Sequence, residues 1–175
     1  MIDHLYHFEY YYAMLEIVTL GNDILRKKCA TVAVFDDKLN DFLQAMIVTM
    51  REGNGIGLAG PQVGVEKRFF VCQVPDQEPF IFINPELIGT SEEVLSYEEG
   101  CLSIPGIYSD VVRPAWVKVQ AWNVKGKPFT IEADGILARV IQHEMDHLKG
   151  VLFIDHVGEK KRTRLIRTYE KRLKK

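Results

Sequence analysis

Cysteine is scarce in this sequence of 175 residues, which has three, at positions 29, 72 and 101. An odd number without framework spacing argues against a scaffold held together by disulfides. The same usage is typical of a reducing compartment, and we therefore expect the chain to act in the cytoplasm.

Long apolar runs are missing as well. No stretch has the roughly 20 consecutive apolar residues that a bilayer-spanning helix needs. The N-terminus has no positive segment followed by an apolar one, so a secretory signal is not expected. Repeats and low-complexity linkers are also absent. We expect neither a membrane nor DNA as a partner.

The composition nevertheless provides for a core, since 47% of the residues are hydrophobic and 26% are charged. The length suits one domain with a terminal appendage. Residues 1–13 are crowded with aromatic side chains and precede an apolar segment that begins after Met14. We interpret residues 1–13 as an N-terminal extension and residues 14–175 as a single catalytic domain.

The charge is unevenly spread along the chain, although its sum is only −2. Residues 159–175 hold nine Lys and Arg against two Glu, a net of +7, so the other 158 residues carry −9. A basic tail on an acidic body suggests a polyanionic partner. A solvated helix face is an equally weighted alternative.

The segment from His143 to His147 reads His-Glu-Met-Asp-His. Two histidines four residues apart on a helix can bind one metal ion, and Glu144 then lies beside it as a base. Asp134 can cap the start of this helix, and Gly150 can close its end. The alternative is a chance pattern in which the histidines are ordinary hydrogen-bonded core residues.

Helical periodicity places the metal-binding candidates on the apolar side of this helix. One continuous arc contains Ile136, Leu137, Val140, Ile141, His143, Glu144, His147 and Leu148. The opposite arc contains Ala138, Arg139, Gln142 and Asp146. Bare ionisable groups on a buried face are costly, and a bound metal removes that cost. Two histidines at ligand spacing on the buried arc therefore favour the metal.

The remaining pattern predicts an α+β fold. Capping residues and apolar stripes predict helices from Asn22 or Asp23 to about Cys29, from Asp36–Asp37 to Gly53, over about 135–149, and over about 159–173. β-rich runs predict strands at 68–74, 80–84 and 93–97, and a hairpin of 111–124 with 128–132. We expect mostly antiparallel sheets packed around a central metal-binding helix, with a C-terminal helix.

Residues 53–62 are too rich in glycine for a helix or a central strand. Glycines of this kind let the backbone approach a ligand closely. The segment lacks the Lys-Ser/Thr pair of a phosphate-binding loop, so nucleotide binding is not expected.

A catalytic zinc-type site needs a third protein ligand. The downstream candidates, Asp155, His156, Glu159 and Glu170, lie in no matching motif. Cys101 is the better source, because it follows a predicted strand and a thiolate is a strong ligand for a borderline metal. For Cys29 and Cys72 we expect the role of inert core residues.

Three separated motifs resemble those of bacterial peptide deformylases. They are Gly55-Ile56-Gly57-Leu58-Ala59-Gly60-Pro61-Gln62, Glu99-Gly100-Cys101-Leu102-Ser103 and Gln142-His143-Glu144-Met145-Asp146-His147. Their order and rough spacing match the family, and the resemblance runs from about residue 15 to 170. Gly60 stands where the family usually has alanine, and residues 1–13 have no counterpart in it.

The resemblance implies removal of the formyl group from the N-terminal formyl-methionine of new proteins. Cys101, His143 and His147 would bind one divalent metal, most often iron(II) in the family. Zinc, nickel and cobalt also suit these ligand types. Metal-bound water would attack the formyl carbonyl, with Glu144 as general acid and base.

The resemblance also assigns residues around the metal. The side-chain amide of Gln62 and the backbone N–H of Leu102 would stabilise the oxyanion. The peptide would lie extended beside Gly57, and its methionine would contact Ile56, Ile136 and Val140. An ion pair of Glu99 with Arg113 would brace the cysteine loop. The basic tail would bind the ribosome.

Two other functions remain as alternatives. The first is an endopeptidase of the His-Glu-x-x-His type, which a cysteine ligand and the glycine loop disfavour. The second is a metal-held scaffold with an RNA-binding tail, which Gln62, Cys101 and Glu144 disfavour.

Overall fold

The computed structural model describes residues 14–174, so the predicted extension at 1–13 lies outside the described residues. Three α-helices, seven strands and three short 3-10 helices occur in this part of the chain. Within it, no helix combines the length and the apolar character needed to cross a bilayer.

Five strands form one antiparallel sheet in the order β1-β2-β3-β6-β7. They are β1 (Gly57–Ala59), β2 (Phe69–Cys72), β3 (Phe80–Thr90), β6 (Trp116–Trp122) and β7 (Pro128–Asp134). A second sheet consists of β4 (Val94–Gly100) and β5 (Tyr108–Pro114), which are also antiparallel. The expectation of mostly antiparallel sheets is confirmed.

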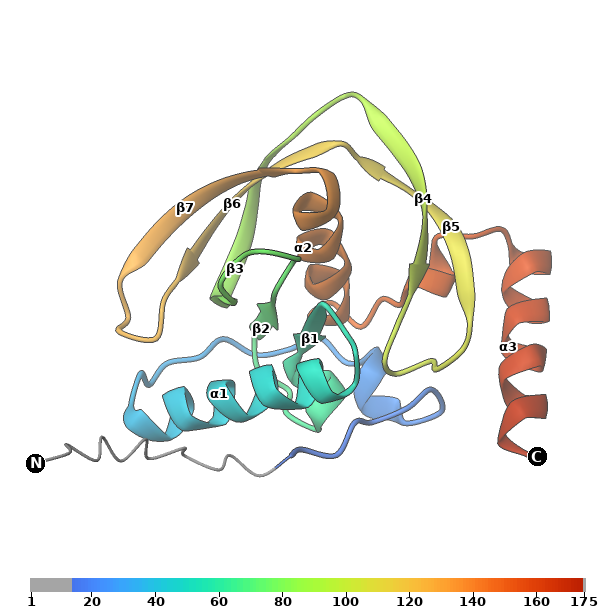
Figure 1. Cartoon of the computed structure of the whole chain (residues 1–175), viewed down its shortest axis with the longest axis horizontal. Coiled ribbons are helices and arrows are strands. Elements are labelled where there is room, and N and C mark those ends of the chain that lie inside the picture. Colours follow the sequence, from blue (N-terminus) through green and yellow to red (C-terminus); the bar gives the residue numbers. More distant parts are fainter. Residues whose placement is uncertain (1–13, 175) are drawn as a thin grey trace, which may run out of the picture.

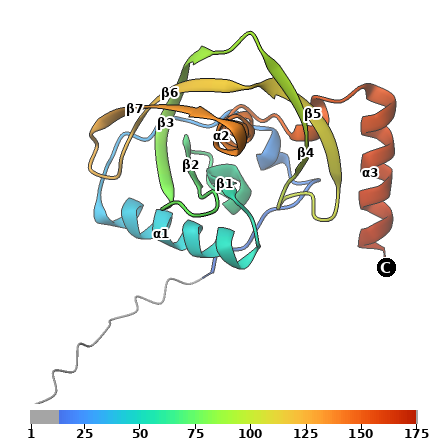
Figure 2. The ribbon, with the colours of Figure 1, turned by 45° about the horizontal axis from the view of Figure 1, so that its top comes forward.

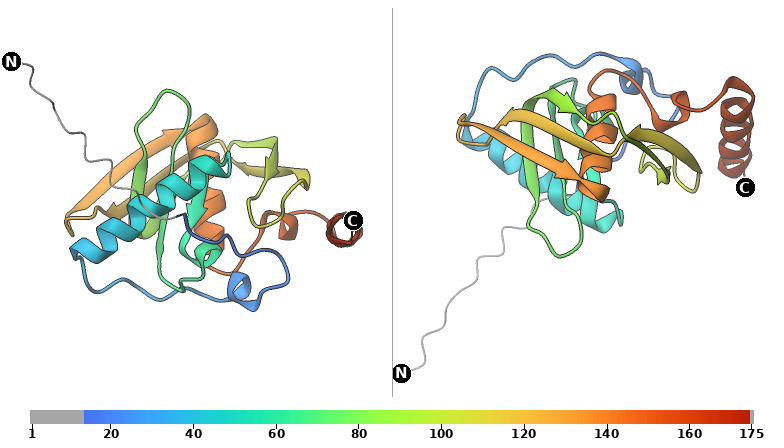
Figure 3. Two further views of the ribbon diagram at one scale, coloured as in Figure 1. Left: turned by 60° about the horizontal axis from the view of Figure 1, so that its bottom comes forward. Right: turned by 90° about the horizontal axis from the view of Figure 1, so that it is seen from above.

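The central helix α2 (Gly135–His147) lies between the two sheets. Figures 1 and 2 show it in the middle of the molecule, with the β4–β5 hairpin beside it. Alternate residues of β2 pack on opposite faces of the larger sheet. Phe70 belongs to the core shared with α2, and Phe69 and Val71 to the core shared with α1 (Asp37–Glu52). Figure 3 shows α1 and α2 on these two faces.

Local signals account for the helix ends. Asp36 caps α1, because its side chain accepts a hydrogen bond from the N–H of Leu39 at 2.9 Å. The predicted first helix is a short 3-10 helix, η1 (Asp23–Arg26), capped by Asn22. Asp134 takes the N-cap position of α2 without a side-chain cap bond, and Gly150 turns the chain at φ +76°.

The prediction of one strand over 111–124 was wrong. The strand ends at Pro114, and the chain continues as β6 in the other sheet after Ala115. Odd-numbered residues are buried on both sides of the break, as Val111 and Val117 show. The alternation of buried and exposed residues along the chain therefore does not reveal the change of sheet. Glycine-rich residues 53–62 contain an edge strand, β1, and the 3-10 helix η2 (Gly60–Val63).

The prediction that α2 has a distinct opposite arc was also wrong. Ala138 and Gln142 are buried, whereas Ile136 from the apolar arc is 53% exposed. The amide of Gln142 is satisfied by the carbonyl oxygens of Ala138 at 3.0 Å and Pro114 at 3.1 Å. A helix that contacts two sheets buries residues on more than one side, so a single apolar arc does not describe its burial.

The C-terminal helix α3 (Glu159–Leu173) follows the 3-10 helix η3 (Phe153–Asp155) at the edge of the molecule (Figure 1). Tyr169 is buried in a core cluster that also contains Ile104 and Ile107. Leu173, at the end of α3, is 65% exposed.

Candidate metal centre

The two predicted imidazole ligands lie one helical turn apart on α2 and are buried, with 8% of His143 and 1% of His147 exposed. Cys101 directly follows the end of β4. Its Sγ lies 3.3 Å from Nε2 of His147. Candidate donor atoms of all three residues lie within 4.8 Å of one another. The structure therefore brings together three residues that are far apart in the sequence.

This donor set suits a divalent ion of borderline softness, because thiolate and imidazole are ligands that such ions prefer. In a tetrahedral zinc site, sulfur at about 2.3 Å and nitrogen at about 2.0 Å lie about 3.5 Å apart. The observed separation of Cys101 Sγ and His147 Nε2, 3.3 Å, agrees with that geometry. Three protein ligands also leave one coordination position for water or substrate. The residues thus fit a catalytic metal ion.

Glu99 orients the first imidazole. Its carboxylate accepts hydrogen bonds from Nε and Nη2 of Arg113 at 2.6 and 2.9 Å, and its Oε2 lies 3.0 Å from Nδ1 of His143. The ion pair expected between Glu99 and Arg113 is therefore formed. Burial alone would raise the pKa of Glu99, but His143 and Arg113 outweigh it and hold the pKa well below its usual range. With Nδ1–H of His143 donating to Glu99, Nε2 is free to bind a metal.

Glu144 lies beside the metal ligands and is only 3% exposed. Burial raises its pKa to about 7, and the charge of His143 opposes that rise. A carboxyl group with a pKa near neutrality can both accept and return a proton. Among the described residues, no group forms a hydrogen bond with its buried Oε2. A buried polar atom of this kind calls for a partner from outside the protein.

Gln62, on η2, has its amide held from two sides. Its Oε1 accepts a hydrogen bond from the N–H of Ala59 at 2.8 Å. Its Nε2 donates toward Oγ of Ser103 at 3.2 Å and Sγ of Cys101 at 3.4 Å. The N–H directed at Cys101 therefore points toward the candidate metal centre. Ser103 was not predicted to take part; it is buried, and its only signal in the sequence is its place two positions after the cysteine.

A cleft of about 450 Å³ adjoins these groups. Every predicted substrate-contacting and oxyanion-stabilising residue lines it: Ile56, Gly57, Gln62, Leu102, Ile136 and Val140. Val140 is buried, whereas Ile56 and Ile136 are 39% and 53% exposed. The apolar wall thus reaches from the buried end of the cleft to solvent.

Two polar residues near the centre were assigned to the wrong side of α2. Arg139 lines the cleft, and Asp146 accepts a hydrogen bond from Nη1 of Arg113 at 2.7 Å. The spacing of four residues between Arg139 and His143 was the available signal, since such residues share a helix face. The downstream candidates Asp155 and His156 bind Arg26 and Asp146 instead of joining the centre.

The other two cysteines are buried, as expected of core residues. Burial raises the pKa of the Cys29 thiol to about 11 and that of Cys72 still further above its ordinary value. Neither thiol is therefore a ready nucleophile or ligand.

Comparisons with a family model, with related sequences and with solved structures all give the same family. The family model described as polypeptide deformylase matches residues 14–163. A peptide deformylase of Borreliella burgdorferi is 48% identical over 156 residues, covering 89% of this chain and 94% of the relative. One from a Synechococcus species is 47% identical over 151 residues, covering 84% and 75%.

Solved structures agree. The peptide deformylase of Legionella pneumophila superposes with a TM-score of 0.88 at 38% identity, covering 93% of this chain and 96% of that one. The enzyme of Synechococcus elongatus, solved in complex with actinonin, gives 0.84 at 41% identity, covering 88% and 86%. With matches of this kind over most of its length, the chain belongs to the polypeptide deformylase family.

Proposed function

We propose that this protein removes the formyl group, by hydrolysis, from the N-terminal formyl-methionine of newly made proteins. The observation that carries the proposal is the convergence of Cys101, His143, His147, Glu144 and Gln62 at one cleft in a chain of this family. Residues 14–175 act as one catalytic domain, and the substrate places its action in the cytoplasm, where nascent chains emerge.

Cys101, His143 and His147 would hold one divalent metal ion. When bound, such an ion lowers the pKa of a coordinated water and polarises a carbonyl group. The resemblance favours iron(II), and the ligand types also suit zinc, nickel or cobalt. Metal analysis of protein purified without oxygen tests this choice.

The protein's own groups handle the proton and the developing charge. Glu144 accepts a proton from the attacking water and returns it to the amine that leaves. The Nε2–H of Gln62 and the backbone N–H of Leu102 donate to the formyl oxygen as it gains negative charge. Ala59 and Ser103 hold the amide of Gln62 in one orientation, with its Nε2 also directed toward Cys101.

The substrate would enter as an extended strand. β1 is at the edge of its sheet, so the backbone at Ile56 and Gly57 has a side open to a peptide. The methionine side chain would contact Ile56, Ile136 and Val140. The reacting carbon would lie among buried groups, where formyl fits and longer acyl chains are rejected by shape.

Activity on a formyl-Met peptide, with no cleavage of a blocked casein substrate, separates this function from an endopeptidase. Glu144→Ala should keep its metal and lose turnover by about three orders of magnitude or more, because the proton carrier is gone. Metal content and initial rates are the measurements. Turnover equal to that of the unchanged protein would instead support a non-enzymatic scaffold.

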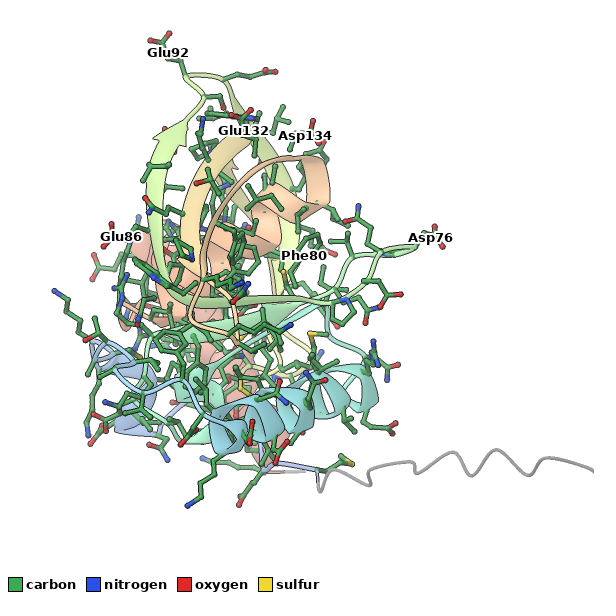
Figure 4. The ribbon with its side chains drawn as sticks, turned by 90° about the vertical axis from the view of Figure 1, so that its left-hand side faces the viewer. Asp76, Phe80, Glu86, Glu92, Glu132 and Asp134 are labelled. Carbon is green, nitrogen blue, oxygen red and sulfur yellow. The ribbon has the colours of Figure 1, made fainter. Side chains whose placement is uncertain are left out.

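We also propose that α3 binds the ribosome near emerging chains. Its basic residues, Lys160, Lys161, Arg162, Arg164 and Arg167, can pair with RNA phosphates. In Figure 4, the labelled acidic side chains of Glu86, Glu92 and Asp76 extend outward from the body of the molecule.

Co-sedimentation with ribosomes tests the role of α3. A chain that ends at Gly158 should bind more weakly, and its residual binding should lose most of its salt dependence. Binding that is unchanged by the truncation, at low and high salt alike, contradicts the proposal.

A further inference from the structure

Arg139 has three hydrogen-bond acceptors, two on β4 and one on β5. It lies one helical turn before His143 on α2, and its side chain is 11% exposed. Its Nη1 donates to Oε1 of Glu99 at 2.8 Å and to the carbonyl oxygen of Val111 at 2.9 Å. Its Nη2 donates to the carbonyl oxygen of Leu95 at 2.7 Å. One guanidinium group therefore joins α2 to both strands of the β4–β5 hairpin.

The position of this junction matters because of what the hairpin carries. Leu95 belongs to β4 and Val111 to β5, and the loop between these strands contains Cys101. α2 carries His143 and His147. Arg139 thus links the segment that supplies the thiolate to the helix that supplies both imidazoles (Figures 1 and 2).

Arg139 is a second positive charge beside the carboxylate of Glu99. Arg113 already pairs with both oxygens of Glu99. A second guanidinium on Oε1 fixes the carboxylate plane from another direction, while Oε2, which also accepts from Arg113, lies 3.0 Å from Nδ1 of His143. Tyr97, itself 57% exposed, covers the guanidinium, with its ring centroid 5.1 Å from Cζ of Arg139. A stacked guanidinium with three acceptors has one available orientation.

We propose that Arg139 is a positioning residue for the metal centre. It holds Glu99 so that His143 keeps one ring orientation, and it fixes the distance between the cysteine loop and the histidine helix. This inference rests on the proposed function, because it requires that Cys101, His143 and His147 bind a metal.

Arg139→Met tests the proposal, because methionine retains an apolar stem and removes every donor. The affinity for Zn²⁺ or Co²⁺, measured by competition with a chromophoric chelator, should fall about 10- to 100-fold, as for other residues that orient metal ligands. The visible absorption of bound Co²⁺ should shift, because the Cys101 and His143 geometry changes. Thermal unfolding of the metal-free protein should be measured alongside.

Arg68→Met is the matched control. Arg68 is half-buried, and its guanidinium also donates to a backbone carbonyl, that of Pro85, but it does not line the cleft. The control should lose thermal stability and keep the original metal affinity and Co²⁺ spectrum. Equal metal affinity in Arg139→Met and the unchanged protein, or equal losses in both variants, would overturn the inference.

Arg139→Lys keeps the measurement possible if the methionine variant does not fold. Lysine retains the charge but cannot reach three acceptors at once, so we expect a loss of several-fold in metal affinity. A metal affinity of Arg139→Lys equal to that of the unchanged protein would contradict the proposal. If the unchanged protein itself binds no metal through Cys101, the proposed function fails, and this result is distinct from the preceding ones.

Discussion

At the scale of single residues, two glycines of the glycine-rich segment serve by the space they leave. A Cβ on Gly57 would lie 2.2 Å from Oε1 of Glu144, so the missing side chain makes room for the carboxylate. A Cβ on Gly60 would lie 2.8 Å from the carbonyl oxygens of Val65 and Lys67. The alanine usual in the family would therefore need a local backbone shift here, and Gly60 is tightly packed.

Gly57→Ala should lower kcat by about 100-fold while metal content stays unchanged. The new methyl group displaces the Glu144 carboxylate, and a displacement of about 1 Å at a reacting group costs a factor of this order. The carboxylate ends a flexible side chain, so the protein should still fold. Initial rates on a formyl-Met peptide and metal analysis are the measurements.

Gly158→Ala is the control for that substitution, since no atom lies within 4 Å of its Cβ position. It should leave kcat unchanged. An undiminished kcat in Gly57→Ala would show that Glu144 is not confined by β1.

At the scale of secondary-structure elements, the β4–β5 hairpin is joined to α2 largely through buried charges. Arg113 on β5 pairs with Glu99 on β4 and with Asp146 on α2, at 2.6 and 2.7 Å. The side chains of Arg113 and Glu99 are each 4% exposed. Buried pairs of this kind hold elements in one arrangement, and losing one partner leaves the other unpaired.

Arg113→Met should lower the free energy of unfolding by about 3–5 kcal/mol, the usual cost of breaking a buried ion pair from one side. The comparison is Lys118→Met on β6, whose pair with Glu132 is largely exposed and should contribute less than about 1 kcal/mol. Urea unfolding of both variants measures the difference. Similar losses of unfolding free energy in the two variants would show that the buried pair stabilises the protein no more than the exposed one.

At the scale of the whole molecule, Asp155 connects the ends of the chain that the structure describes. It bonds with Arg26 of η1 and lies 3.2 Å from Nη2 of Arg162 on α3. It also accepts a hydrogen bond from the N–H of Leu152 at 2.8 Å. Burial tends to raise its pKa, but Arg26 and the N–H of Leu152 outweigh burial and lower it below 3.8.

This lowered pKa predicts a pH dependence of stability. The carboxylate stabilises the fold fully above the unfolded pKa near 3.8, and the contribution is lost as pH falls through the lower folded pKa. Asp155→Asn should be less stable than the unchanged protein at pH 6, and the gap should narrow below about pH 4. Urea midpoints of both proteins, measured from about pH 2.5 to about pH 7 so that the titration of Asp is covered, give this difference in stability. A difference that stays constant with pH contradicts the assignment.

The sequence by itself determined the local features of this protein. The histidine pair follows from helical spacing, and Asp36 and Gly150 mark helix ends by their own chemistry. The α+β class and the motifs of the family were also readable, because each depends on residues close together in the chain.

Only the tertiary structure decided which distant residues meet. It separated β5 from β6, buried α2 on more than one side, and brought Arg139 and Asp146 to charges on the hairpin. Local periodicity encodes the direction of a side chain on its own helix or strand. It carries no information about what another segment, 30 or 40 residues away, presents to that side chain, as the separations of 33 and 40 residues in these two contacts illustrate.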